Sequence, residues 1–171
     1  MKMKTKYTIQ ELALLGLMTA TLSLGKSVLA FIPNVEIVSF LIIIYTLLFG
    51  FKVLWAVFAF VLLEIFSYGL GLWTVMYLYI WPLLSLLTLL FRKIKNPFFW
   101  SFLSGIYGLA FGGLCSIPYL FIGGPYMMYT WWLSGLPWDL THGIANFVIC
   151  LILFVPITSL LKKLQSGVLP G

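Results

Sequence analysis

Charged residues are scarce in this chain, and acidic residues are the scarcest. Only 8% of its 171 residues are charged, and just four are Asp or Glu. A soluble domain carries about 25% charged residues, with which it covers its surface in solvated groups. A chain that is 63% hydrophobic cannot build such a surface, and lipid is the solvent that suits it. The sequence therefore predicts an integral membrane protein that crosses the bilayer several times.

The sequence also lacks the residues and motifs of several kinds of chemistry. It has one histidine and two cysteines, which excludes a histidine-rich metal site, a zinc-binding spacing and a disulfide framework. Cys115 and Cys150 lie inside apolar runs, where we expect them to be small buried side chains. No HExxH, GxSxG or GxxxxGK motif is present, so neither a cofactor nor a nucleotide site is predicted. Any ATP-driven work would have to come from a partner.

Long apolar runs make up most of the chain, and residues that break helices divide them. A helix that crosses about 30 Å of hydrocarbon needs about 20 apolar residues. Gly50, Gly69 and the run Gly123-Gly124-Pro125 mark the ends of such runs. The predicted fold is an all-α bundle of six transmembrane helices in one membrane domain, residues 1–171. The expected spans are 8–31, 35–49, 52–68, 72–91, 98–122 and 137–161, with Pro118 kinking or ending the fifth. The aromatic segment 126–136 is too short to span and is expected to be interfacial or re-entrant.

The positions of the basic residues test this number of spans. Nine of the ten fall before span one, between spans two and three, between spans four and five, or after span six. They are Lys2, Lys4, Lys6, Lys52, Arg92, Lys93, Lys95, Lys162 and Lys163. Six spans place all four positions on one side of the membrane, and cytoplasmic loops are rich in Lys and Arg. Both termini are therefore predicted to be cytoplasmic, and the net charge of +6 does not indicate binding to nucleic acid.

Most of the other ionisable residues fall at the opposite side of the predicted bundle. They are Lys26, Glu36, Glu64, Asp139 and His142. Charges within a bilayer are costly and usually face a bundle interior or a watery cavity. The sequence therefore predicts a polar cavity that is open to the outside. For Lys26, Glu36 and Asp139, contact with headgroups or water at the interface is the alternative.

The spacing of polar and aromatic residues along these helices also favours a cavity. Asp139, His142 and Asn146 share one helix face, and the aromatic residues of the fourth span recur every four positions. Aromatic walls with a few acceptors suit a flat, polar organic ligand, although such stripes also serve as packing or interface belts. Because acids outnumber Lys26, a donor-rich or cationic ligand is expected. The predicted substrate-binding residues are Lys26, Glu36, Glu64, Tyr68, Trp73, Tyr77, Trp81, Asp139, His142 and Asn146.

Small residues form a different feature near the start of span one. Gly16 and Ala20 make a small-xxx-small pair, with Ala13 beside it. Small residues on a membrane helix let another helix approach closely. The sequence leaves open whether this face packs within the bundle or binds a partner protein.

Two short segments give the chain a resemblance to a known family. They are Ile-Pro-Asn-Val-Glu at residues 32–36 and Pro-Trp-Asp-Leu-Thr-His-Gly-Ile-Ala-Asn-Phe at residues 137–147. With its size, six spans, cytoplasmic termini and small-residue motif, most of the chain resembles the S components of energy-coupling factor (ECF) transporters. These are the substrate-binding subunits of prokaryotic importers for vitamins and related micronutrients.

The resemblance implies a location, partners and a way of working. It implies a prokaryotic cell membrane protein without enzymatic activity, which binds a small organic micronutrient at the outer side. Its partners would be a transmembrane scaffold subunit and two cytoplasmic ATPases, and the protein would topple in the membrane to deliver its ligand. Residues 31–35 would act as a gate. The scaffold-binding motif of the family is usually Ala-xxx-Ala; Gly16-xxx-Ala20 is the best match here, and Leu17 stands where a second alanine would follow Ala13.

The resemblance does not decide which ligand is bound. Cobalt and nickel S components begin with Met-His, which this chain lacks, so a metal-ion substrate is rejected. Cobalamin, a B6 vitamer and a queuosine-type precursor all stay open. Two other classes compete: a five-span tryptophan-rich sensor or translocator of the TspO type, suggested by the seven tryptophans, and a small intramembrane enzyme that uses Asp139 and His142.

Overall fold

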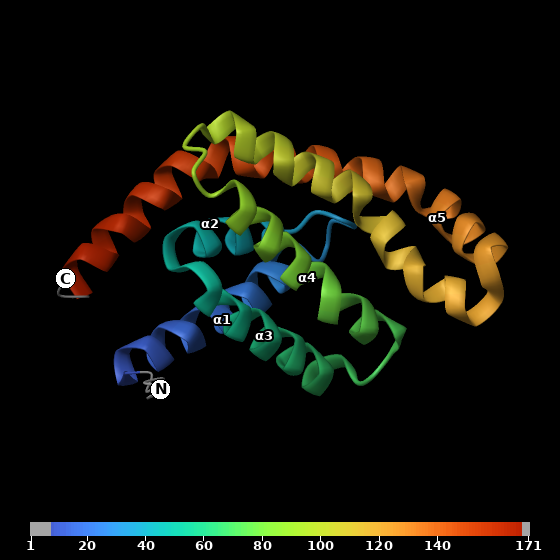
Figure 1. The fold of residues 1–171 in the computed structure, drawn as a ribbon, viewed down its shortest axis with the longest axis horizontal. Helices are drawn as coiled ribbons and strands as arrows, with labels where there is room; N and C mark the ends of the chain where they lie inside the picture. The colour runs from blue at the N-terminus through green and yellow to red at the C-terminus, as the bar shows by residue number, and fades with distance from the viewer. Residues whose placement is uncertain (1–7, 169–171) are drawn as a thin grey trace.

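A computed structural model describes residues 8–168, and this part of the chain is helical almost throughout (Figure 1). The predictions that rest on Lys2, Lys4 and Lys6 lie outside the described residues. The elements in order are α1 (Ile9–Val28), α2 (Val38–Phe49), the 3-10 turn η1 (Gly50–Lys52), α3 (Val53–Tyr68), α4 (Leu72–Phe91) and α5 (Pro97–Val168). No strand occurs among these residues, so the prediction of an all-α protein is confirmed.

Local interactions and glycine residues explain where several of the helices begin and end. Thr8 and Glu11 form a capping box at the start of α1, with bonds of 3.2 and 3.0 Å between each side chain and the other residue's backbone N–H. Gly50 and Gly69 follow the ends of α2 and α3 at φ of 63° and 78°, in the left-handed region that glycine adopts without strain. Residues 29–37 are not helical. The first predicted span is therefore too long at its end, and the second starts too early.

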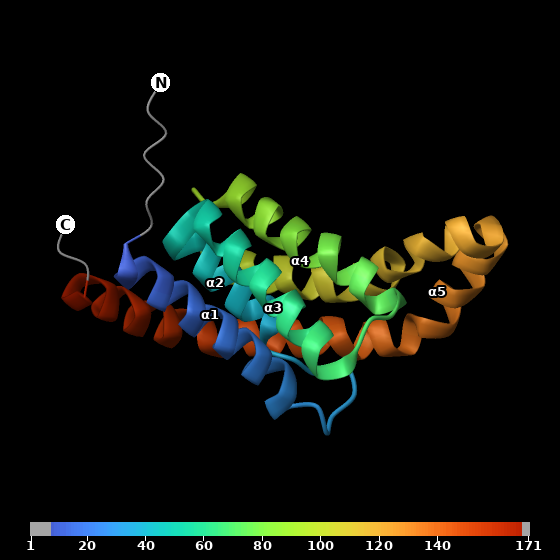
Figure 2. The same cartoon turned by 90° about the horizontal axis from the view of Figure 1, so that it is seen from below.

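Helix α5 doubles back on itself. Its backbone leaves helical geometry at Gly123 and Gly124, and Figures 1 and 2 show the chain reversing at the far end of the molecule. A Cβ on Gly108 would lie 2.8 Å from the Cα of Gly143, so residues 97–122 (the first arm) and 137–168 (the second arm) lie side by side. Pro118 does not end the first arm, because the helix continues through it to the break at the two glycines.

The segment between the arms packs against the first arm. Residues 126–136 are helical, and the ring of Trp131 stacks on Tyr119 with centroids 4.8 Å apart. A Cβ on Gly113 would lie 3.3 Å from the indole of Trp132. Trp131 and Trp132 are therefore brought back over the end of the first arm.

The core lies around α2. This helix is apolar on most of its surface, and residues 38–46 are buried except for Leu41. It packs against α1, α3, α4 and α5, which is the position expected of a helix that is hydrophobic all round. Large apolar side chains such as Phe66 and Leu70 are more than 80% exposed on the outside, which suits an apolar surrounding medium.

Three stretches within residues 8–168 are long and apolar enough to cross a membrane. They are Val38–Tyr68, Leu72–Phe91 and Pro97–Leu164. The first contains the turn at η1, and the last contains the break at Gly123 and Gly124. These stretches make the protein compatible with a membrane location.

Apart from Lys26 in the last turn of α1, the described basic residues belong to segments at one end of the molecule. Figures 1 and 2 both place the start of α1, η1, the connection from α4 to α5 and the C-terminal end of α5 toward the same end. An ion pair between Lys52 and Glu11 joins two of these segments. The loop 29–37, the turn between α3 and α4 and the reversal of α5 lie away from that end.

Candidate ligand-binding site

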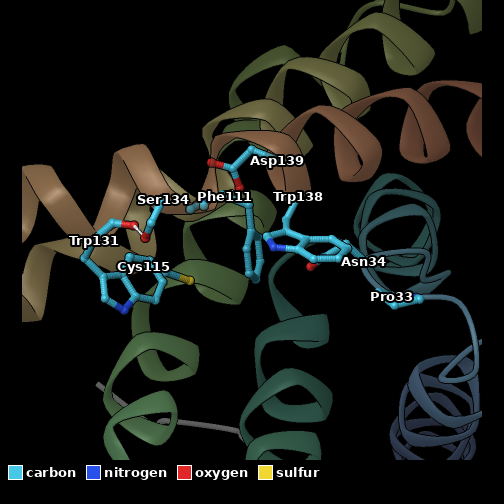
Figure 3. A pocket seen from close by; sticks show the side chains of 10 residues that line it. Pro33, Asn34, Phe111, Cys115, Trp131, Ser134, Trp138 and Asp139 are labelled. Carbon is cyan, nitrogen blue, oxygen red and sulfur yellow. Dashed lines mark hydrogen bonds between the residues drawn. The ribbon is translucent and has the colours of Figure 1, made fainter.

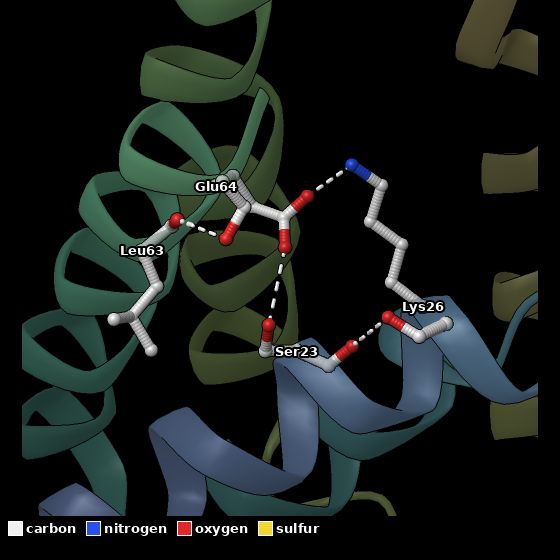
Figure 4. Close-up of polar contacts among 6 residues, drawn as sticks. Ser23, Lys26, Leu63 and Glu64 are labelled. Carbon is white, nitrogen blue, oxygen red and sulfur yellow. Dashed lines mark hydrogen bonds and ion pairs between the residues drawn. The ribbon is translucent and has the colours of Figure 1, made fainter. Parts of the chain in front are cut away.

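An ion pair joins the last turn of α1 to α3. The ammonium of Lys26 contacts Oε2 of Glu64, and the hydroxyl of Ser23 donates to Oε1 at 3.2 Å (Figure 4). The side chain of Glu64 is 1% exposed, whereas that of Lys26 is 30% exposed. A buried carboxylate is tolerated when it has a cation and hydrogen-bond donors. Two residues predicted for the site therefore meet each other.

Aromatic rings surround the ammonium of Lys26. Its Nζ lies 4.7 Å from the ring centroid of Tyr68, 5.6 Å from that of Trp73 and 5.2 Å from that of Tyr77. These distances are within the range of about 6 Å for cation–π attraction. The rings of Trp73, Tyr77 and Trp81 continue edge to face at 5.3 and 5.4 Å. The aromatic stripe of α4 thus borders the polar site.

A second polar contact fastens the loop 29–37 to α5. Nε2 of His142 lies 3.1 Å from Oε1 of Glu36, and an ionised carboxylate can only accept, so the imidazole donates. The backbone N–H of Ser39 donates to Oε2 of Glu36 at 2.8 Å. The ring of Phe111 lies 4.7 Å from the imidazole, edge to face. Glu36 is therefore held from both the start of α2 and the second arm.

Asp139 and Asn146 are buried without a full set of partners. Asp139 is 6% exposed, and its Oδ1 accepts the backbone N–H of Gly112 at 2.8 Å. Its Oδ2 has no partner among the described residues, nor has either amide atom of Asn146, which is 1% exposed. Each such group costs about 1–3 kcal/mol if left unsatisfied. Groups of this kind are typical of a site that water or a ligand completes.

One cavity lies between the Lys26 ammonium and the Glu36–His142 pair. Its volume is about 240 Å³, and we call it the lysine cavity. Tyr77, Trp81 and Phe111 supply its aromatic wall, and the loop residues 32–36 border it.

A second cavity lies beside Asp139. Its volume is about 420 Å³, and we call it the Asp139 cavity (Figure 3). Phe111, Trp131 and Trp138 are its aromatic residues. Pro33, Asn34 and Phe111 line both cavities, so the two are neighbours that share a wall formed by the loop and the first arm.

The structure brings nine of the ten predicted site residues to these cavities or to the Lys26 ion pair beside them. The exception is Asn146, which lies one helical turn beyond His142 and lines neither cavity. Tyr68 stands at the rim, 63% exposed. The partners and burial of Glu36 and Asp139 favour a cavity over the interfacial alternative.

Sequence reasoning missed several residues of the site. Phe111, Trp131 and Trp138 were not predicted to line it, although aromatic residues near Pro137 were a signal of an aromatic surface. Gly112 was also missed. A Cβ at that position would lie 2.3 Å from Oδ2 of Asp139, and a glycine inside an apolar helical run is a signal of such a close approach.

The small-residue face of α1 points away from the rest of the described fold. Ala13, Gly16 and Ala20 are exposed, and a Cβ on Gly16 would meet nothing within 4 Å. Thr19 faces the other way and contacts the carbonyl of Ala56 at 3.3 Å. Packing of this face inside the described fold is therefore ruled out.

Comparisons with models of protein families, with curated proteins and with solved structures gave no match for this chain. The geometry of the site is therefore the main basis for assigning a function.

Proposed function

We propose that this chain is the substrate-binding S component of an ECF-type importer for a small organic micronutrient. In this proposal it is a six-span bundle in a prokaryotic cell membrane, with both termini in the cytoplasm. One observation carries it: residues from α1, α2, α4, α5 and the loop 29–37 line adjoining cavities with aromatic walls and few polar groups. Sites of this composition bind small organic molecules.

The distribution of charge supports an outward-facing site. The basic segments lie toward one end of the molecule (Figure 2), and the positive-inside rule assigns such an end to the cytoplasm. The loop 29–37, which borders both cavities, lies away from that end. Ligand would therefore enter from outside, past the loop.

The size of the cavities favours a small ligand. Small-molecule sites have volumes of about 300–1,000 Å³. The lysine cavity, at about 240 Å³, is slightly smaller than this range, and the Asp139 cavity, at about 420 Å³, lies in its lower part. A B6 vitamer or a queuosine-type precursor fits that size better than cobalamin, which needs a wide, shallow mouth.

The exposed face of α1 supports a docking role. Small residues that pack against nothing in the described fold give another helix room to approach closely. We assign Ala13, Gly16 and Ala20 to the contact with a transmembrane scaffold subunit, through which two cytoplasmic ATPases supply the energy.

Ligand retention and transport test the proposal together. Native mass spectrometry of the purified chain is expected to show one small organic molecule bound without ATP. Cells that express the chain with a scaffold and ATPases are expected to take that molecule up, and cells that express the chain alone are not. Uptake by the lone chain in cells without such partners would contradict the proposal.

A further inference from the structure

Asp139 differs from the other acidic residues of the chain in its partners. Glu64 contacts Lys26, Glu36 contacts His142 and Glu11 contacts Lys52. Within residues 8–168, Asp139 alone among the four acids has no bond to a basic side chain; its one hydrogen bond comes from the backbone of Gly112. A buried carboxylate without a cation is costly. A ligand that offers a cation or a hydrogen-bond donor would supply the missing partner.

The walls of the Asp139 cavity are suited to an organic cation. Phe111, Trp131 and Trp138 line it together with the carboxylate. Aromatic faces attract cations, tryptophan most strongly, and aromatic cages bind quaternary ammonium groups. A bare metal ion is disfavoured, because hard cations need about six oxygen ligands. Moreover, no cluster of three His, Cys, Asp or Glu occurs among the described residues.

We propose that the Asp139 cavity is a subsite for an organic ammonium group. The carboxylate neutralises its charge, and Phe111, Trp131 and Trp138 enclose its apolar surface. The inference rests on the proposed function, since it assigns this group to one end of the transported ligand. The lysine cavity next to it already contains a cation, the ammonium of Lys26. The ligand therefore carries a cationic nitrogen at one end and a hydrogen-bond acceptor at the other.

Choline and its neutral isostere 3,3-dimethylbutan-1-ol provide the test. The full-length chain is purified in dodecyl maltoside, which carries no charge, and titrated with each compound while tryptophan emission is recorded. Asp139→Asn removes the carboxylate charge and keeps its shape. Glu11→Gln is the matched control, because it removes one negative charge at the other end of the molecule and retains a residue that suits a capping box. Trp138→Leu is a second variant, at a side chain that is 53% exposed.

The expected result is saturable binding of choline, with the isostere about tenfold weaker, because its neutral head group makes neither the cation–π contact nor the ion pair. Asp139→Asn and Trp138→Leu weaken choline binding by about tenfold, whereas Glu11→Gln leaves it unchanged. Equal binding of the isostere, unchanged choline binding in both site variants, or no saturable choline binding by the wild-type chain overturns the subsite.

The uptake experiment separates this inference from the proposed function. If transport needs the partners and the retained micronutrient is uncharged, the result supports the proposed importer and contradicts the ammonium subsite. If the lone chain transports its ligand, the proposed ECF-type importer is contradicted, and the choline titration still tests whether the Asp139 cavity binds an ammonium group.

Discussion

Lys26 and Glu64 form an ion pair whose loss is expected to affect both stability and ligand binding. Glu64 is almost completely buried, and Lys26 is the cation beside it. Removing one partner of a buried pair leaves an uncompensated charge, which costs about 3–5 kcal/mol, whereas replacing both partners is often neutral.

We therefore expect Lys26→Met to lower the unfolding free energy more than the double variant Lys26→Met/Glu64→Gln. Thermal unfolding in detergent of the wild type, both single variants and the double variant measures the coupling. If the effects of the two single substitutions simply add, the two side chains do not depend on each other, and the pair does not hold α1 to α3.

Glu64→Gln is also expected to weaken the binding of the retained ligand by about tenfold or more, because Lys26 loses the carboxylate that fixes its ammonium at the cavity. Titration of ligand-free protein measures this. Glu11→Gln, whose ion pair lies at the opposite end of α1, is expected to bind normally.

Gly112 offers a test of the position of Asp139. In Gly112→Ala the new methyl group would lie 2.3 Å from Oδ2 of Asp139, so the carboxylate must move. We expect ligand affinity to fall by about tenfold and the unfolding free energy by about 1–3 kcal/mol. Gly16→Ala is the control, since its methyl group meets nothing within 4 Å and is expected to stabilise α1 by about 0.5–1 kcal/mol. Normal ligand binding by Gly112→Ala would show that Asp139 does not bind the ligand.

At the scale of elements, α1 has two distinct features on different parts of its surface. Ser23 and Lys26, near its C-terminal end, contact Glu64 at the candidate site, and its small-residue face is exposed. A bulky residue on that face should therefore obstruct a partner helix without reaching the cavities.

We expect Gly16→Leu and Ala20→Leu to bind ligand as the wild type does and to lose most transport by the assembled complex. Binding to the purified chain and uptake by cells with the partners are measured separately. Ala110→Leu, at an exposed position on the first arm of α5, controls for added bulk on the outer surface of the protein. Full transport by both α1 variants would show that this face does not contact the partner.

At the scale of the whole molecule, the arrangement of the basic segments predicts the orientation. Because these segments lie toward one end (Figure 1), both termini are expected to be cytoplasmic. Reporter fusions at each end measure this directly. A C-terminus outside and an N-terminus inside would contradict six spans and would instead match the five-span TspO type.

Composition and local rules were enough to predict an all-helical fold with long apolar stretches and most places where its helices end. The scarcity of charge requires an apolar environment, and Gly50, Gly69 and Gly124 supply the positive φ that the breaks need. The extent of the loop 29–37 was not predictable in this way. That loop is fastened by Glu36 and His142, 106 positions apart in the chain, and no local pattern reports such a contact.

The sequence by itself determined which residues were available for a site. Ionisable groups are few in an apolar chain, and the helix breaks predict how far along each span such a group lies. Only the tertiary structure decided which of them pair. The rotation of each helix and the fold-back of α5 set those distances. As a result, Glu64 pairs with a lysine and Glu36 with a histidine. One oxygen of Asp139 has no partner among the described residues, and Asp139 lines a cavity together with three aromatic residues. That last arrangement gives the site its expected preference for a cation.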